Sequence, residues 1–309
     1  MDKHVPVLLK ETIELLEIKP NGIYVDMTLG GGGHSEAILS NLPQGKLFGF
    51  DQDIYAINKS LERLKKYSNF EPINDNFLNA KERLFNLGIH EVDGIIFDLG
   101  VSSFQFDIPE RGFSYRYDAP LDMRMNQSAK TDAFYVVNNY SFEDLIRIFF
   151  EYGEEKYARF IANKIVKYRQ LKPIYTTFEL VDIIKSALPY KELNKKGHPA
   201  KKVFQALRIE VNHELEILEQ SLINAIDILK VGGRLAVITF HSLEDRIVKQ
   251  LFKRLSTIEI PKGLAIIVDK KPVINLVNRK VITADTEELE DNFRAHSAKL
   301  RVVEKNKKI

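Results

Sequence analysis

Hydrophobic and polar positions in the first hundred residues follow two periodicities in turn. Short apolar runs that are typical of buried strands cover 23–27, 46–50, 71–74 and 94–99. Apolar residues recur at helical spacing over 8–16, 34–41, 54–67 and 80–87. Strands that alternate with helices predict right-handed βαβ units and a parallel sheet.

The pattern changes after residue 104. Residues 105–137 have the sparse periodicity of a long structured loop. Three helices without an intervening strand are predicted at 142–152, 156–168 and 177–188. A long helix with apolar residues from Val211 to Leu229 follows, ends in a turn at Lys230–Gly233, and leads to a strand at Leu235–Phe240. We therefore expect an α/β domain of residues 1–106 and 208–309 with a mostly helical insertion over 107–207.

The amino-acid composition excludes several classes of protein and of functional site. The 309 residues carry a net charge of only +2, so any nucleic-acid contact must come from local basic patches. The absence of cysteine excludes a disulfide framework, a cysteine zinc site, an iron–sulfur cluster and a thiol nucleophile. No apolar run approaches the roughly 18 residues of a membrane span. The polar N-terminus lacks a signal-peptide core, so we expect a cytoplasmic protein.

A glycine cluster, Gly30–Gly33, joins the first predicted strand to the helix that begins near His34. Glycines there allow a bulky ligand to approach backbone N–H groups at a helix N-terminus. The spacing differs from the G-x-G-x-x-G of dinucleotide-binding proteins. A purely structural tight turn is the alternative interpretation.

Acidic residues end two of the predicted strands. Asp51 stands where doubly wound sheets bind the hydroxyls of a ribose, and Asp98 points into the crevice at the carboxyl edge. Phe77, which follows the third strand, is a candidate to lie beside an adenine. Helix capping by the aspartates and ordinary core packing of Phe77 are the alternatives.

Further candidates lie later in the chain. His241 and Ser242 leave a strand toward the same edge, although a lone histidine is more often structural. The stretches 191–202 and 294–308 are basic, which suits contacts to phosphates, while solvated surface is the alternative.

Several segments together resemble one family, the bacterial small-subunit (16S) ribosomal RNA cytosine N4-methyltransferases, also called RsmH or MraW. The segments are HVPVLLKE (4–11), VDMTLGGGGHS (25–35), FDLGVSS (97–103), RGFS (111–114), PLDMRM (120–125), FQALRIEVNHEL (204–215), GGRLAVITFHSLEDRIVK (232–249) and SAKLR (297–301). They cover nearly the whole chain in order. The resemblance implies a Rossmann-like class I fold, S-adenosylmethionine as cofactor, and methylation of one cytosine N4 in the decoding region of the small-subunit ribosomal RNA.

The resemblance also implies residue roles. The cofactor-binding residues would be Gly32, Gly33, His34, Asp51, Phe77, Asp98 and Gln105. The chemistry of methyl transfer, rather than the resemblance, makes Asp98 the candidate to accept an N4–H bond in catalysis, and His241 a second group to bind the base or pass on the proton. Candidate substrate contacts are Ser102, Ser103, Lys195, Lys196, Lys201, Lys202, Lys299 and Arg301.

No metal is expected, because the sulfonium leaving group is already activated. The expected partner is ribosomal RNA within the small subunit, with a homodimer left open. The rival classes are an NAD-dependent oxidoreductase and a non-catalytic RNA-binding assembly factor.

Overall fold

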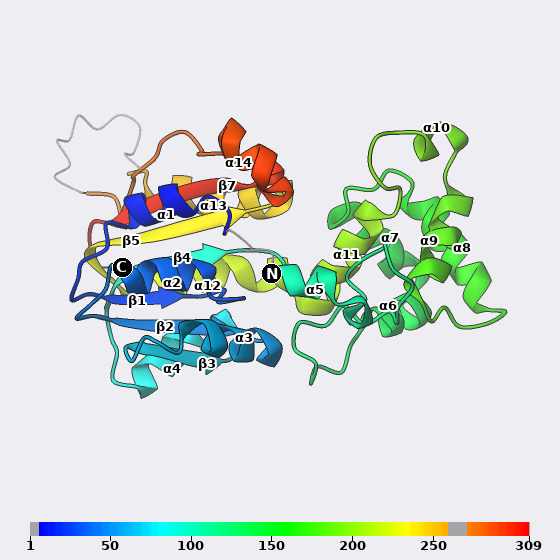
Figure 1. Ribbon diagram of the computed structural model, residues 1–309. Helices are drawn as coiled ribbons and strands as arrows, with labels where there is room; N and C mark the ends of the chain where they lie inside the picture. Colours follow the sequence, from blue (N-terminus) through cyan, green and yellow to red (C-terminus); the bar gives the residue numbers. More distant parts are fainter. Residues whose placement is uncertain (1–5, 259–270, 309) are drawn as a thin grey trace, which may run out of the picture. The chain divides into compact units, whose positions relative to one another are not determined.

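The structure is a computed structural model that describes residues 6–258 and 271–308 (Figure 1). The chain forms two compact units. The first comprises Met1–Gly100 and Glu216–Ile309, and the second comprises Val101–Leu215. These boundaries differ from the expected junctions at 106/107 and 207/208. The short helix α5 (Ser103–Asp107) and all of helix α11 (Lys201–Asn212) belong to the second unit.

A seven-stranded sheet forms the centre of the first unit. Its strands are β1 (Ile23–Asp26), β2 (Lys46–Asp51), β3 (Phe70–Asn74), β4 (Val92–Asp98), β5 (Leu229–Thr239), β6 (Ile274–Leu276) and β7 (Lys299–Lys305). Their order is β3-β2-β1-β4-β5-β7-β6. Strands β1 to β5 are parallel, whereas β7 runs antiparallel to both β5 and β6. The α/β Rossmann-like prediction is confirmed, but the sheet is mixed rather than wholly parallel.

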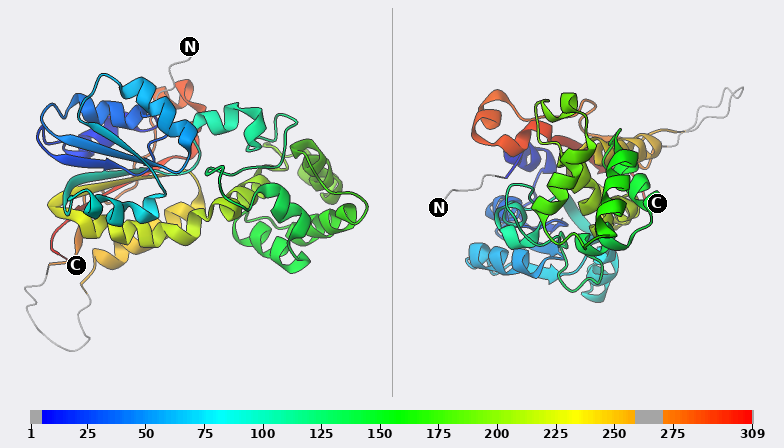
Figure 2. Two further views of the ribbon diagram at one scale, coloured as in Figure 1. Left: turned by 90° about the horizontal axis from the view of Figure 1, so that it is seen from below. Right: turned by 90° about the vertical axis from the view of Figure 1, so that its right-hand side faces the viewer.

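Helices cover both faces of the sheet, as Figure 2 shows. The helices of the first unit are α1 (Leu9–Leu16), α2 (Gly33–Ser40), α3 (Ile54–Leu64), α4 (Ala80–Asn86), α12 (Glu214–Ile228), α13 (Ser242–Leu255) and α14 (Thr286–Asp291). Successive residues of β4 serve opposite faces. Ile96 packs in the core with α1, α2 and α3, whereas Ile95 and Phe97 pack with α4, α12 and α13. The sheet is therefore the middle layer of three.

The region read as one long helix from residue 211 is broken. Helix α11 ends at Asn212, His213 adopts the left-handed conformation with φ 53°, and α12 then begins. The side chain of Asn212 accepts from the Met125 N–H at 2.8 Å and donates to the Met123 carbonyl at 2.8 Å. The break follows an asparagine that is committed to a loop of the second unit, a role that periodicity does not reveal.

One expectation about the first unit is wrong, and one alternative interpretation is excluded. Lys230–Gly233, expected as a turn, is an irregular stretch inside β5, where the pairing with β4 jumps from Leu229 to Arg234. The C-terminal basic stretch, for which a solvated tail was the alternative to phosphate contacts, contains β7 at an interior position of the sheet. Within β7, buried Leu300 and Val302 alternate with the more exposed Lys299 and Arg301.

The second unit is helical. Besides α5 and α11, it contains α6 (Ala133–Asn139), α7 (Phe142–Glu151), α8 (Ala158–Arg169), α9 (Thr177–Ala187) and α10 (Tyr190–Leu193). Helices α6, α7, α8, α9 and α11 share one apolar core that includes Leu145, Ile161, Leu180 and Leu207. Among the described residues of the whole chain, no helix is long and apolar enough to cross a membrane.

Candidate active site at the carboxyl rim of the sheet

Three parallel strands of the first unit end in carboxylates at one edge of the sheet. These are Asp26 on β1, Asp51 on β2 and Asp98 on β4. β1 lies between β2 and β4, so the strand order reverses direction here. In open α/β sheets, ligands bind outside the carboxyl ends of strands at such a switch point. We call this edge the carboxyl rim.

The glycine cluster forms a tight turn between β1 and α2. Gly30 and Gly32 adopt positive φ angles of 49° and 75°, which L residues with a Cβ rarely tolerate. A Cβ on Gly32 would approach Leu64 to 3.2 Å and a Cβ on Gly33 would lie 2.3 Å from Pro6, whereas one on Gly31 would meet no atom within 4 Å. The turn is therefore packed on one side and open at Gly31.

Asp51 fastens this turn to β2. Its Oδ2 accepts from the Gly30 N–H at 2.9 Å, and its Oδ1 accepts from the Asp53 N–H at 2.9 Å. Burial raises the pKa of Asp51 to about 7, although both N–H groups favour the charged form. Each carboxylate oxygen keeps a second lone pair. Asp51 can therefore both hold the turn and accept a ribose hydroxyl.

His34, in the first turn of α2, contacts Asp98. Its Nδ1 lies 3.4 Å from Asp98 Oδ2, and its Nε2 lies 3.1 Å from the Val7 carbonyl oxygen. Burial opposes a charge on the ring, but the hydrogen bond to Asp98 and its negative charge raise the pKa of His34 overall. The two acceptors suit an imidazolium, in which both nitrogens donate.

The other oxygen of Asp98, Oδ1, is buried and makes no hydrogen bond to any residue that the structure describes. A buried acceptor without a donor costs about 1–3 kcal/mol. A ligand ammonium or an exocyclic amine placed at the rim would remove that cost. The unsatisfied oxygen, the open side of Gly31 and the Asp51 carboxylate together fit a nucleoside ligand that carries an amine.

Asp26 is a part of the rim to which the sequence interpretation gave no role. It accepts from the Ser35 hydroxyl at 2.7 Å and from the Thr28 N–H at 3.1 Å, and burial raises its pKa. The Thr28 hydroxyl accepts from the Asp98 N–H at 2.6 Å. These bonds connect the ends of β1 and β4. Asp26 ends a predicted strand, as Asp51 does, and this position is the sequence feature that could have identified it.

Comparison with known proteins identifies the family. The family model described as "MraW methylase family" matches residues 1–306. The chain belongs to the MraW methylase family. A relative from Streptococcus mutans named "Ribosomal RNA small subunit methyltransferase H" is 58% identical over 307 residues, which cover 98% of this chain and 97% of the relative. The chain is thus a methyltransferase, and its cofactor is S-adenosylmethionine.

Solved structures give weaker matches. One is an rRNA methylase from Streptococcus thermophilus, with 14% identity, a TM-score of 0.45, and coverage of 98% of this chain and 99% of that chain. Another is a putative methyltransferase from Streptococcus mutans in complex with SAH, with 13% identity, a TM-score of 0.46, and coverage of 97% and 99%. These TM-scores are too low to add to the argument. Family membership itself decides against the oxidoreductase and non-catalytic alternatives.

Two other residues of the first unit have structural roles. Phe77 begins the 3₁₀ helix η1 (Phe77–Asn79), and its ring packs edge-on against Phe97 with centroids 5.5 Å apart. His241 is the N-cap of α13. Its Nδ1 accepts from the Glu244 N–H at 3.5 Å, and its Nε2 lies 3.0 Å from Glu244 Oε1. Both geometries agree with the structural alternatives, so roles beside adenine or in catalysis stay predictions.

Lys299 and Arg301 of β7 are paired within the first unit. Lys299 Nζ lies 3.1 Å and Arg301 Nε 2.9 Å from the carboxylate of Asp245. Burial opposes the charge of Asp245, but these two cations hold its pKa below the usual range. A bond to Asp245 competes with any phosphate for the same donors. The pair is therefore a weaker RNA candidate than the sequence suggested.

The remaining predicted residues lie in the second unit. Gln105 is buried, and its Oε1 accepts from the Ser102 N–H at 3.0 Å at the start of α5, which begins at Ser103. Lys195 pairs with Glu192 at 2.7 Å, and Lys202 donates to the Glu154 carbonyl at 2.6 Å.

Lys196 and Lys201 of the same basic stretch are exposed. They make no side-chain hydrogen bond or ion pair within the described part of the chain. Lys191 of this stretch is likewise exposed and makes no such contact within the described residues, so these three cations of 191–202 are available to phosphates.

Proposed function

We propose that the protein transfers the methyl group of S-adenosylmethionine to N4 of one cytosine in the decoding region of small-subunit ribosomal RNA. The name of the 58% identical relative supports a small-subunit ribosomal RNA substrate. Asp98 supports an amino group as the methyl acceptor. Its buried Oδ1 has no hydrogen-bond donor, and an amino group supplies one.

The proposed cofactor contacts follow the rim. The turn at Gly32 and Gly33 and the His34 side chain would line the methionine part, and Asp51 would accept the ribose hydroxyls. Phe77 would lie beside the adenine, and Asp98 and Gln105 would complete the site. When bound, the cofactor supplies a methyl group on a sulfonium, which is already activated for transfer.

The enzyme's own task is to position and activate the amine. Cytosine N4 is a poor nucleophile because its lone pair is delocalised into the ring. An N4–H bond to Asp98 Oδ1 localises that lone pair and offsets the positive charge that develops at N4. When N4 gains the methyl group it must lose a proton, and His241 is the second candidate, either to bind the base or to pass on this proton. Ser102 and Ser103 are candidates to bond the edge of the base.

Asp98→Asn tests this role, because the amide keeps the size of the side chain and removes its charge. Loss of one preorganised electrostatic contact lowers kcat by about 100- to 1000-fold in enzymes that depend on it. We expect such a loss in methyl transfer, with the Kd for S-adenosylhomocysteine changed by much less. Normal turnover with normal cofactor affinity would remove Asp98 from catalysis.

The substrate is tested by label transfer. Small ribosomal subunits from cells that lack the gene are incubated with the protein and methyl-labelled S-adenosylmethionine, and the modified nucleotide is mapped. We expect one labelled cytosine with the methyl group on N4. Label on a ring carbon, on another RNA, or on a protein would contradict the proposal. Parallel incubation with naked RNA shows which form is accepted.

We further propose that the helical unit recognises the RNA and that Lys196 and Lys201 contribute to it. Removing residues 130–200 should abolish RNA methylation and spare cofactor binding, because the rim belongs to the other unit. Equal loss of both activities would contradict a separate substrate domain. A cytoplasmic location and a homodimer stay predictions.

A further inference from the structure

The outward face of helix α8 has an unusual composition. Its exposed residues are Arg159, Phe160, Asn163, Lys164 and Lys167, and at 100° per residue they occupy one continuous side of the helix. The opposite side packs into the core of the unit through Ala158, Ile161 and Ile165. The exposed face thus combines three cations with an amide and a phenylalanine and contains no carboxylate.

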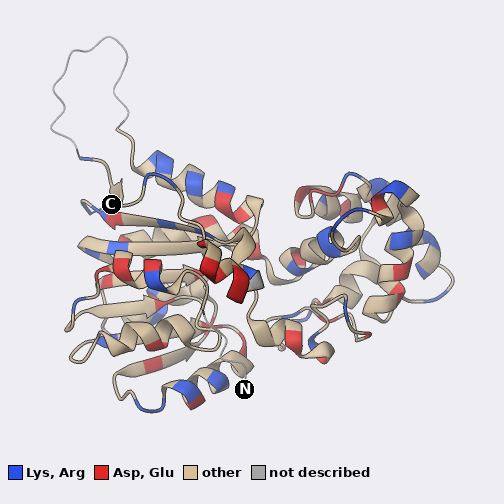
Figure 3. Ribbon diagram, turned by 45° about the horizontal axis from the view of Figure 1, so that its top comes forward, with Lys and Arg blue, Asp and Glu red and all other residues tan. Residues whose placement is uncertain are grey.

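The cations on this face are available. Lys164 and Lys167 make no ion pair or side-chain hydrogen bond with any residue in the described ranges. Arg159 lies over the ring of Phe142 at 5.9 Å, a contact that leaves its N–H groups free to donate at the ring's periphery. By contrast, Lys195 in the basic stretch is already held by Glu192. Figure 3 shows the distribution of Lys and Arg over the helices of this unit.

An exposed aromatic ring lies among these cations. Phe160 is 62% exposed, one turn before Lys164 on the same side of the helix. Of the eight aromatic side chains described as exposed, seven belong to the second unit. The exposed ring of Phe160 therefore lies on the same side of the helix as the cations and is accessible to a base.

The cations and the exposed aromatic ring together indicate which ligand binds this face of α8. Proteins that bind single-stranded nucleic acid combine cations that follow the phosphates with aromatic side chains on which bases stack. RNA recognition in particular uses unpaired bases stacked on aromatic rings. Helix α13 offers a comparison: it exposes Arg246, Lys249 and Lys253, but no exposed large hydrophobic residue is described on it. In α8, by contrast, both features lie on one face.

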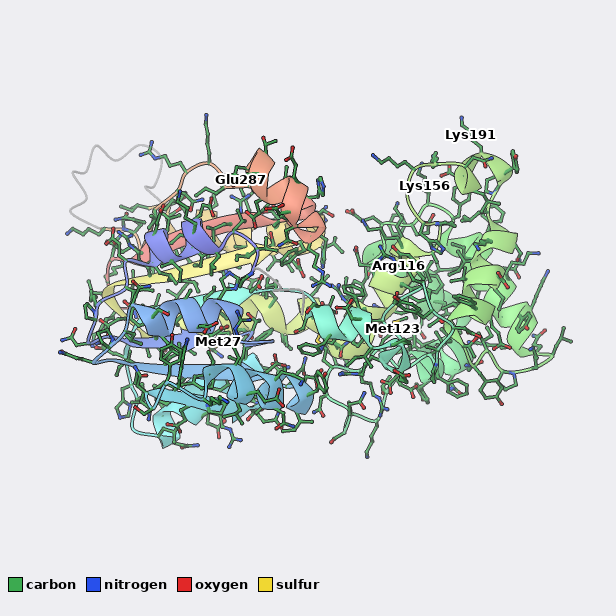
Figure 4. All side chains as sticks on the ribbon, viewed as in Figure 1. Met27, Arg116, Met123, Lys156, Lys191 and Glu287 are labelled. Atoms are coloured by element: carbon green, nitrogen blue, oxygen red, sulfur yellow. The ribbon has the colours of Figure 1, made fainter. Side chains whose placement is uncertain are left out.

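We propose that the exposed face of α8 is an RNA-docking surface, on which Arg159, Lys164 and Lys167 contact phosphates and Phe160 stacks on an unpaired base. This inference rests on the proposed RNA substrate and adds a contact surface outside the catalytic rim. Figure 4 labels two further lysines of the same unit, Lys156 and Lys191.

Two variants of the full-length protein test the surface. Lys164→Gln/Lys167→Gln removes two charges while keeping residues of good helix propensity. For binding to a fluorescein-labelled single-stranded RNA, each lost phosphate contact reduces the slope of log K against log salt by about 0.7. We therefore expect the slope to fall by about 1.4 for this variant. Phe160→Ala should weaken binding about 5- to 100-fold with little change in slope.

A matched control removes two lysines that neighbouring carboxylates already neutralise. Lys59 pairs with Glu62, and Lys66 pairs with Glu36, each at 3.0 Å. Lys59→Gln/Lys66→Gln changes the net charge equally, and its salt slope should match that of the wild type. Equal losses in both double variants would mean that net charge alone binds RNA, and would overturn the surface on α8.

Methylation assays separate this inference from the proposed function. If the wild type methylates small subunits, the α8 variants should raise KM for subunits and leave the Kd for S-adenosylhomocysteine unchanged. Unchanged KM and RNA affinity would refute the α8 surface while the proposed function stands. Weaker subunit binding with unchanged naked-RNA binding would also refute it, because it would indicate a protein partner. If the wild type methylates no RNA, the proposed function fails on its own.

Discussion

The pKa of Asp51 makes cofactor affinity depend on pH in a range that is easy to measure. The carboxylate must be ionised to accept both ribose hydroxyls at full strength, and burial raises its pKa to about 7. The apparent Kd equals the intrinsic Kd divided by the fraction of protein in the competent state. At pH 6 that fraction is about one tenth, and at pH 8 it is about nine tenths. The apparent Kd for S-adenosylhomocysteine should therefore rise about tenfold between pH 8 and pH 6.

Calorimetric titration with S-adenosylhomocysteine at several pH values measures this change directly. Below pH 7, binding should release up to about one proton, which appears as a dependence of the apparent enthalpy on the buffer. Asp51→Asn is the control, since it keeps one acceptor oxygen and cannot ionise. It should bind more weakly at pH 8 and lack this pH dependence. His34 remains in both proteins, so the difference between them isolates Asp51.

Ionisation of Asp51 also affects stability. It lowers the free energy of unfolding, whereas ionisation of a salt-bridged aspartate raises it. The pKa of Asp51 in the folded protein exceeds its usual value of 3.8, so the native state binds more protons than the unfolded state between pH 4 and 7. The protonated Asp51 side chain stabilises the fold fully below pH 4. This contribution to the free energy of unfolding, up to about 4 kcal/mol, is lost as the pH rises from 4 through 7.

Two results would refute the reasoning about Asp51. One is a wild-type Kd for S-adenosylhomocysteine that does not change from pH 6 to 8, and the other is an equal dependence of Kd on pH in Asp51→Asn.

Three further predictions follow from the turn and from the second unit. Gly31→Ala should unfold at nearly the wild-type temperature, because its Cβ meets no protein atom within 4 Å, yet lose at least about tenfold in affinity for S-adenosylhomocysteine if the cofactor occupies that space. Gly33→Ala should lower the free energy of unfolding in urea by about 1–3 kcal/mol, because its Cβ would lie 2.3 Å from Pro6; an unchanged midpoint would contradict the packed turn. Asn212→Ala should cost about 2–4 kcal/mol, since it leaves the Met125 N–H and Met123 carbonyl without their partner, and a urea midpoint like that of the wild type would contradict this role.

Much of the first unit could be predicted from local pattern. The apolar runs that end in Asp51 and Asp98 marked parallel strands, and parallel strands bring their carboxyl ends to one edge. The positions at which the strands end were therefore sufficient to predict that these aspartates lie at the rim. The family resemblance supplied Gln105 and the substrate, which no spacing rule contains.

The parts that sequence reasoning missed depend on contacts between distant residues. In β7, Lys299 and Arg301 alternate with apolar residues, but the same letters suit a basic tail until β5 provides a partner strand. Their pairing with Asp245, over 50 residues earlier in the chain, is likewise non-local. The helix break at His213 depends on a backbone conformation and on Asn212 bonds to a loop almost 90 residues away. Periodicity reports local preference and carries none of this information.

The most direct test of the central claim is a crystal structure of the protein with S-adenosylhomocysteine. We predict electron density for the ligand at the carboxyl ends of β1, β2 and β4, with its ribose hydroxyls at Asp51 and the glycine turn along its methionine part. Density for the ligand at another surface, with this edge of the sheet holding only solvent, would contradict the account.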